Sequence, residues 1–345
     1  MIIKNALAAA ALAAAATLIT TSASASTPDW LNCPNTAEVD MRTAQDRGVN
    51  AVQQIAPSAG ANTSAELTGH AHLSMLSYEM YDAFDRGENP LALVPDNLSV
   101  IALIYGDPGR DTERRRDRKP RDTSTFYGFV ADEKSTKQRA IVLRGTLQPN
   151  EWLRNLQARQ SPYPAGVGRW RAKAWVHSGF LKIFSSLKSE EGGVQKSLLQ
   201  ALPNLTSGRE VVIIGHSLGG ALAVLTGVEA ARLSPEDAPK LRVVTFGSPR
   251  VGDLGFAEMA KRVGKIDRVC NLPDVVTAVP PSTGRTTYTH IGNVFRVSSF
   301  DWPELGNNFE REQKILCWHS IYTYRYMTDP EKVVFSELEP CLAQP

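Results

Sequence analysis

The feature that most constrains this chain is the stretch VVIIGHSLGGALAVLTG, residues 211–227. Four apolar residues precede a turn of small residues and an alanine-rich segment, a pattern that indicates a strand running directly into a helix. Such a corner presents one residue at the carboxyl edge of a sheet, where open α/β folds bind their ligands. Gly215 and Gly219, two positions either side of Ser217, are small enough to avoid the strand and the helix. We therefore expect a nucleophile elbow that raises the Ser217 hydroxyl into solvent at the helix N-terminus.

Other glycine-rich turns do not fit this stretch. A phosphate-binding loop ends in Gly-Lys-Ser or Gly-Lys-Thr, whereas here Gly220 is followed by Ala221. A dinucleotide-binding turn would need glycine at the position of Ser217. An ordinary turn that happens to contain a serine is the remaining alternative.

The rest of the chain indicates an α/β fold. Helical periodicity appears at 66–86, 180–202 and 218–233, and short apolar runs typical of strands begin at Thr125, Ala140, Trp175, Glu210, Leu241 and Arg268. Strands that alternate with helices predict a mostly parallel central sheet with helices on both faces. No repeat or linker interrupts residues 26–345, so we expect a single domain.

Charge gives no reason to expect a nucleic-acid partner. The formal net charge is only +2 at pH 7. One charged run, residues 110–122, mixes acidic with basic side chains and contains no aromatic residue for base stacking. We interpret it as a solvated loop.

The first 25 residues have the pattern of a secretory signal peptide. One lysine precedes an apolar run from Ala6 to Ile19, and the segment ends in the small-residue pattern Ala23-Ser24-Ala25. The run is short for a membrane span, and no later segment supplies a transmembrane anchor. We expect a secreted or periplasmic protein.

Four cysteines in an exported chain suggest two disulfides, and three pairings are possible. We favour Cys33 with Cys341, which would join the two ends, and Cys270 with Cys317. Four unpaired thiols are the alternative.

A serine nucleophile needs a general base, and the base needs a carboxylate to hold its tautomer. In an elbow of this kind the acid and then the histidine follow the serine along the chain. Beyond Ser217 the candidates for the base are His290 and His319, and those for the acid are Asp274 and, less well placed, Asp253.

Several motifs together resemble the class 3 lipases of the α/β-hydrolase superfamily. In chain order these are RGT followed by EWLRNL, then VHSGF, GHSLGGALA, TFGSPRVGD and NLPDVVTAVP, and the likeness extends from about Glu66 to Tyr326. The resemblance implies that Ser217 is the nucleophile, Asp274 the acid and His319 the base. It matches His290 to a histidine beside the site that is not the base, and it implies neither a metal nor a cofactor.

The same resemblance implies an oxyanion hole and a lid. One donor would be the backbone N–H of Leu218, and the other would come from Thr146, through its backbone N–H with or without its hydroxyl, unless Thr146 is an ordinary threonine at a strand end. Trp152, Leu153 and Leu156 match the position of the family's lid, although one tryptophan and two leucines could equally belong to a buried helix.

These observations predict a secreted serine carboxylic-ester hydrolase that works through an acyl-enzyme. A triacylglycerol lipase is the first expectation, with a phospholipase A1 or a feruloyl-type esterase acting on aromatic-acid esters as alternatives on the same scaffold. The expected partner is an acyl-ester lipid substrate at a lipid–water interface, and no obligate protein partner is evident. A binding protein without chemistry would lack a member of the triad, whereas a protease or amidase would use the same three residues.

Overall fold

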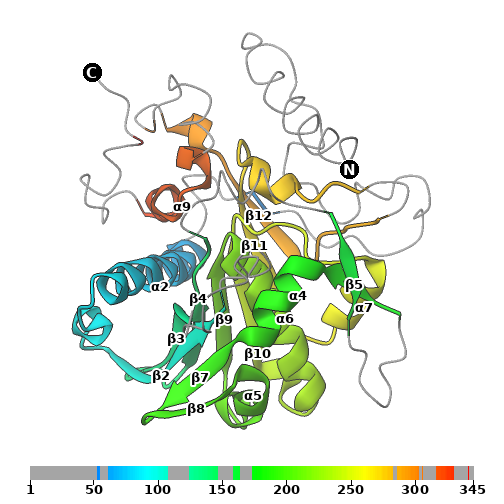
Figure 1. Ribbon diagram of the computed structural model, residues 1–345. Helices are drawn as coiled ribbons and strands as arrows, with labels where there is room; N and C mark the ends of the chain where they lie inside the picture. The colour runs from blue at the N-terminus through cyan, green and yellow to red at the C-terminus, as the bar shows by residue number, and fades with distance from the viewer. Residues whose placement is uncertain are drawn as a thin grey trace, which may run out of the picture.

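A ten-stranded mixed sheet forms the centre of the molecule in the computed structural model (Figure 1). The structure describes residues 53–54, 61–107, 124–146, 158–163, 173–282, 286–302, 305, 316–329 and 341. The expected signal peptide at residues 1–25, the lid residues Trp152, Leu153 and Leu156, and Cys33 lie outside this part of the chain.

One half of the sheet is parallel and the other half antiparallel. The parallel half consists, in spatial order, of β1 (Gln53–Gln54), β12 (Asn293–Val297), β11 (Lys265–Asn271), β10 (Leu241–Phe246), β9 (Val211–His216) and β4 (Arg139–Leu143). The antiparallel half continues with β3 (Thr125–Glu133), β2 (Leu98–Gly106), β7 (Lys188–Glu191) and β8 (Val194–Ser197). A separate antiparallel pair joins β5 (Gln160–Pro162) to β6 (Trp175–His177).

Helices cover both faces of the sheet. One apolar core contains side chains from α4 (Ser178–Ser186), α5 (Leu198–Thr206), α6 (Leu218–Leu233) and α7 (Leu254–Ala260). The other contains side chains from α2 (Ala61–Asp85) and α9 (Ile321–Thr328). Strand β9 shows how the sheet serves both cores, because Ile213 packs in the first and its neighbours Val212 and Ile214 pack in the second.

Four short 3₁₀ helices complete the described elements: η2 (Pro90–Leu93), η4 (Ala238–Lys240), η5 (Val275–Ala278) and η6 (Ser299–Asp301). Among the helices that the structure describes, none combines the length and the apolar character that a membrane crossing requires.

The expected α/β-hydrolase architecture, with helices on both faces of the sheet, is confirmed, but two local predictions are wrong. The helix expected over 180–202 is divided by the hairpin of β7 and β8, because Gly192 and Gly193 both take positive φ and form a tight turn. The strand expected over Trp175 to Phe180 does begin at Trp175, but it ends at His177 because α4 begins at Ser178. Strand β2 was not expected from the sequence.

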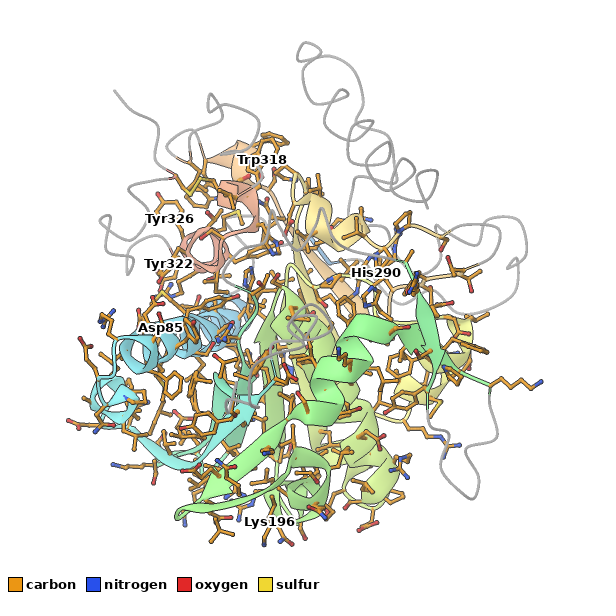
Figure 2. All side chains as sticks on the ribbon, in the orientation of Figure 1. Asp85, Lys196, His290, Trp318, Tyr322 and Tyr326 are labelled. Atoms are coloured by element: carbon orange, nitrogen blue, oxygen red, sulfur yellow. A yellow bond between two sulfur atoms is a disulfide. The ribbon has the colours of Figure 1, made fainter. Side chains whose placement is uncertain are left out.

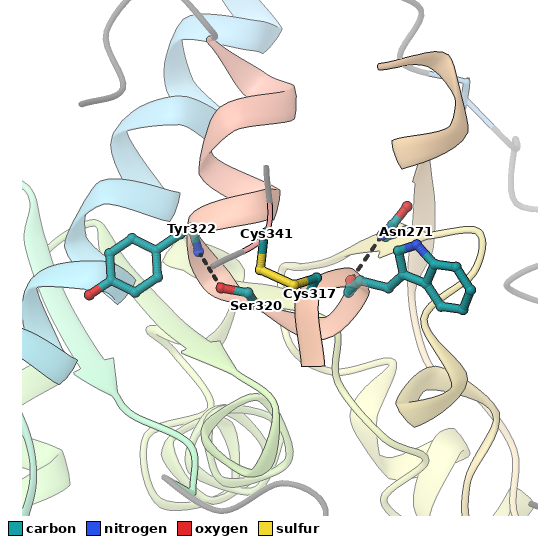
Figure 3. The surroundings of a disulfide bond; sticks show 6 residues. Asn271, Cys317, Ser320, Tyr322 and Cys341 are labelled. Atoms are coloured by element: carbon teal, nitrogen blue, oxygen red, sulfur yellow. Dashed lines mark hydrogen bonds between the residues drawn. A yellow bond between two sulfur atoms is a disulfide. The ribbon is translucent and has the colours of Figure 1, made fainter. Parts of the chain in front are cut away.

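Both expected disulfide pairings are wrong. Cys317 is bonded to Cys341, 24 residues away, and their Cα atoms lie 5.3 Å apart (Figure 3). This pair uses one partner from each expected bridge, so neither Cys33–Cys341 nor Cys270–Cys317 forms. Cys270 lies on β11, where it packs against Val294 of β12, and it is itself disulfide-bonded. Bonding depends on which Cβ atoms approach in space, and the spacing of cysteines along the chain does not determine that.

The Cys317–Cys341 bridge lies two residues before His319, and removing it tests how firmly this segment is held. Replacing both cysteines with serine should lower the free energy of unfolding by about 3 kcal/mol, because a closed loop of this length restricts the unfolded chain by that amount. Urea unfolding of the double variant and the parent protein measures the difference. Equal midpoints and slopes would contradict a stabilising role for the bridge.

Candidate active site

Four neighbouring parallel strands end at one edge of the sheet, and the candidate site lies there. Gly145 and Thr146 follow β4, Ser217 follows β9, Gly247 follows β10 and Asp274 follows β11. Because β4, β9, β10 and β11 are adjacent and parallel, their carboxyl ends bring these residues together although up to 129 positions separate them in the chain.

The turn after β9 has the strained backbone that the sequence suggests. Ser217 has φ 58° and ψ −128°, a conformation that L-residues other than glycine rarely adopt. A Cβ at Gly215 would lie 2.1 Å from the Gly219 carbonyl oxygen, and one at Gly219 would lie 2.1 Å from the Leu143 oxygen. Both positions therefore require glycine for α6 to begin directly against β4 and β9.

Ser217, His319 and Asp274 form one hydrogen-bonded chain. His319 Nε2 lies 2.7 Å from Ser217 Oγ, and His319 Nδ1 lies 2.8 Å from Asp274 Oδ2. A carboxylate can only accept, so the proton of a neutral His319 is on Nδ1 and Nε2 is left to accept from the serine hydroxyl. This arrangement can remove the Ser217 proton as a nucleophile forms.

Tyr324 on α9 supports the carboxylate, a contact that sequence reasoning missed. Its hydroxyl donates to Asp274 Oδ2 at 2.7 Å and accepts from the Asn271 backbone N–H at 2.9 Å. Burial, together with the adjacent Asp274 carboxylate, raises the pKa of Tyr324 well above its usual value, so the phenol keeps the proton that it donates. Asp274 Oδ1 accepts from the Val276 backbone N–H at 2.9 Å, which fixes the other carboxylate oxygen.

The segment that carries His319 is anchored to the sheet through its neighbour. The side-chain amide of Asn271, at the end of β11, donates to the Trp318 carbonyl oxygen at 2.9 Å (Figure 3). Ser299 also holds this amide, donating its backbone N–H to Asn271 Oδ1 at 2.9 Å. His319 is therefore held in place both by contacts to its imidazole ring and by contacts to the backbone next to it.

The expectation that Ser217 is exposed is wrong. Its relative exposure is 0%, and Asp274 and His319 are each 2% exposed. The loop after β4 packs against the serine, since a Cβ at Gly145 would lie 2.8 Å from Ser217 Cβ. The hydroxyl consequently faces His319 rather than bulk water.

The two expected oxyanion donors are chain neighbours of the residues that make this contact, since Leu218 follows Ser217 and Thr146 follows Gly145. Leu218 is the first residue of α6, so its backbone N–H has no acceptor within the helix. Thr146 follows Gly145 directly and is reached from β4. Gly145, the neighbour of Thr146, lies against Ser217, and an oxyanion at Ser217 would need donors of this kind.

The alternative base and acid lie elsewhere. Figure 2 shows His290 well apart from Trp318, the chain neighbour of His319. His290 is buried, its Nε2 has no hydrogen-bond partner among the residues that the structure describes, and burial, assisted by Arg268 and Arg250, lowers its pKa well below the usual value. Asp253 instead caps α7, where it accepts from the Phe256 backbone N–H at 2.9 Å. Within the described residues, no cluster of three or more His, Cys, Asp or Glu side chains could hold a metal ion.

Comparison with known proteins relates this geometry to ester hydrolases. Residues 140–284 match the family model described as lipase (class 3). Among solved structures, the Rhizomucor miehei triacylglyceride lipase superposes with a TM-score of 0.51 at 25% identity, covering 69% of this chain and 82% of that one.

Two plant enzymes are among the curated relatives. A chloroplastic Arabidopsis thaliana protein named galactolipase DONGLE is 27% identical over 302 residues, covering 75% of this chain and 64% of the relative. The chloroplastic phospholipase A1-Ialpha2 of the same plant is 28% identical over 267 residues, covering 67% and 54%. This chain therefore spans between about half and two thirds of the length of these relatives.

A matched pair of glycine substitutions tests the steric account of the elbow. Gly219→Ala should lower the free energy of unfolding by about 3 kcal/mol or more, because its Cβ would meet backbone atoms that cannot move independently. Gly69→Ala, in the interior of α2 with open space around it, should raise the same quantity by about 0.5–1 kcal/mol. Urea unfolding measures both, and a Gly219→Ala protein as stable as the parent would refute the account.

Proposed function

We propose that this chain, which matches the class 3 lipase model over residues 140–284, is a carboxylic-ester hydrolase that cleaves acyl esters of glycerolipids with Ser217 as the nucleophile. His319 is the general base and Asp274 the carboxylate that orients it. The observation that carries the proposal is the hydrogen-bonded chain from Ser217 Oγ through His319 to Asp274, built on a serine with positive φ.

The reaction follows from that geometry. Ser217 Oγ attacks the ester carbonyl carbon while His319 Nε2 takes the hydroxyl proton. The carbonyl oxygen becomes an oxyanion, which accepts hydrogen bonds from the backbone N–H groups of Leu218 and Thr146. His319 then gives its proton to the leaving alcohol, and an acyl-enzyme remains. Water, deprotonated by the same imidazole, attacks the acyl-enzyme and releases the fatty acid and the serine.

Asp274 and Tyr324 lower the energy of the charged intermediate state. When His319 gains the serine proton, the Asp274 carboxylate at 2.8 Å stabilises the imidazolium. The Tyr324 hydroxyl at 2.7 Å keeps that carboxylate aimed at the ring. Because these groups are buried, solvent does little to screen the attraction between them.

Triacylglycerol is the first candidate substrate, supported by the likeness to the Rhizomucor miehei triacylglyceride lipase at 25% identity. A polar glycerolipid is the second candidate. It is supported by the galactolipase and phospholipase A1 relatives, whose alignments cover 75% and 67% of this chain.

The proposal extends to regions outside the described residues. Residues 1–25 would direct export and be removed, leaving residues 26–345 as a single domain. Trp152, Leu153 and Leu156 would form an apolar cover that turns toward a lipid surface. The support for both statements is the sequence pattern.

Fatty-acid release from three substrates tests the proposed function. Emulsified triolein, phosphatidylcholine vesicles and monogalactosyl diacylglycerol vesicles are each incubated with the parent protein, Ser217→Ala and, as control, Ser207→Ala at an exposed serine. Ser217→Ala should lose at least about 10³-fold of the rate on every substrate that the parent cleaves, because no other group replaces the nucleophile. Ser207→Ala should match the parent.

The outcomes separate the candidates. Faster release from triolein supports the triacylglycerol assignment, and faster release from either vesicle supports a polar glycerolipid. A Ser217→Ala protein that keeps half the parent rate would overturn the assignment of the nucleophile, and a parent protein that cleaves none of the three would overturn the substrate class.

A further inference from the structure

We infer that Tyr78 and Arg144 are positioning residues that orient the backbone N–H of Thr146 toward the oxyanion. This inference rests on the proposed function, in which Thr146 supplies one of the two oxyanion donors. It deepens that proposal by assigning a role to two side chains that do not belong to the triad.

Both backbone polar groups of Gly145, its N–H and its carbonyl oxygen, are hydrogen-bonded to side chains. Its N–H donates to the Tyr78 hydroxyl at 2.9 Å, and its carbonyl oxygen accepts from Arg144 Nη1 at 2.7 Å. The peptide bond after Gly145 is trans, because Val279–Pro280 is the cis bond among the described residues. In a trans peptide the carbonyl and the following N–H point in opposite directions. Fixing the Gly145 carbonyl therefore fixes the direction of the Thr146 N–H.

Arg144 is well suited to fix that carbonyl, because its own position is restricted. The guanidinium is buried, 4.0 Å from the ring centroid of Tyr81 and 5.0 Å from that of Tyr127. Its Nε donates to the Phe126 carbonyl oxygen at 2.7 Å. Two of the hydrogen bonds of this guanidinium, each of 2.7 Å, thus go to backbone carbonyls, and a planar group held in this way orients the backbone around it.

Tyr78 connects the same loop to the elbow. Its hydroxyl lies 2.7 Å from His216 Nδ1, and His216 Nε2 lies 2.6 Å from the His319 carbonyl oxygen. A carbonyl can only accept, so Nε2 carries the ring proton. Burial, with a smaller contribution from His319, lowers the pKa of His216 well below its usual value, so the ring is neutral and Nδ1 accepts.

These assignments give one direction to the whole chain of hydrogen bonds. The Gly145 N–H donates to the Tyr78 oxygen, the Tyr78 O–H donates to His216 Nδ1, and His216 Nε2–H donates to the His319 carbonyl. Every donor has an acceptor, and burial keeps Tyr78 protonated because it raises the pKa of that phenol far above the usual value. The loop of the oxyanion donor is thereby connected to the backbone of the base.

The close approach of this loop to the nucleophile explains why its orientation matters. A Cβ at Gly145 would lie 2.5 Å from the Tyr78 hydroxyl oxygen and 2.8 Å from Ser217 Cβ, so Gly145 packs closely against both residues. A small rotation of this peptide would turn the Thr146 N–H away from the oxyanion. Misplacement of a catalytic group by about 1 Å can reduce a rate by about 10²-fold.

Tyr78→Phe tests the inference with Tyr105→Phe as the matched control. The first substitution removes the hydroxyl that holds Gly145 and keeps the ring, whereas the second removes a hydroxyl from another half-buried tyrosine of the same apolar core. The probe is a soluble nitrophenyl butyrate, with active sites counted by titration with an alkyl phosphonate. Affinity for an alkylboronic acid, whose serine adduct carries a tetrahedral oxyanion, is measured in parallel.

Tyr78→Phe should lower kcat per titrated site by about 10- to 100-fold, leave KM within about twofold, and weaken boronic acid binding by a similar factor. Tyr105→Phe should change none of these. A purely structural role for Tyr78 would reduce the number of titratable sites without changing kcat per site, and that result would overturn the inference.

Arg144→Lys provides a second route to the same answer if Tyr78→Phe does not fold. Lysine keeps the positive charge but lacks the planar guanidinium that donates to two carbonyls at once. The affinity for the boronic acid and kcat per site should therefore fall together, and unchanged values would overturn the inference.

Ser217→Ala distinguishes failure of this inference from failure of the proposed function. If Ser217→Ala is inactive while Tyr78→Phe equals Tyr105→Phe per titrated site, only the role of Tyr78 is refuted. If Ser217→Ala is active, the proposed function itself fails.

Discussion

The positive φ of Ser217 is the constraint on which the rest of the site depends. It turns the chain from β9 into α6 within one residue, and that turn is possible only because Gly215 and Gly219 allow backbone to meet backbone. A residue held in such a conformation costs about 1–3 kcal/mol, which the surrounding packing must offset. The apolar cores on both sides of β9 provide that packing, since the strand is buried along its whole length.

His319 depends on contacts of a different kind, because no strand of the sheet carries it. The Asp274 carboxylate holds its ring, His216 holds its carbonyl, and the Asn271 amide holds the carbonyl of the preceding residue. The Cys317–Cys341 bridge adds a covalent restraint two residues away. A base that enters the site from outside the sheet is thus kept in place by several long-range contacts acting together.

The parts of the fold that could be predicted from sequence are those with local causes. The collision that excludes a side chain at Gly215 is with Gly219, only four residues away, so the elbow was recognisable from its spacing, although a side chain at Gly219 would meet Leu143 of β4, which is distant in the chain. The hairpin at 188–197 was missed because helical periodicity around it outweighed the signal of Gly192 and Gly193.

Contacts between residues far apart in the chain could not be predicted. Tyr78 contacts His216 across 138 positions and Tyr324 contacts Asp274 across 50, and the spacing of residues along the sequence carries no information over such separations. The disulfide pairing failed for the same reason, and so did the expected exposure of Ser217.

Covalent labelling tests the central claim most directly, because it reports which atom is the nucleophile without any assumption about the lipid. The protein is treated with a fluorophosphonate, digested and mapped by mass spectrometry, with His319→Ala as the comparison. The account predicts a single adduct on the peptide that contains Ser217, and slow or absent labelling when the imidazole at 2.7 Å is removed. An adduct on another residue, or labelling of Ser217 at the same rate without His319, would contradict it.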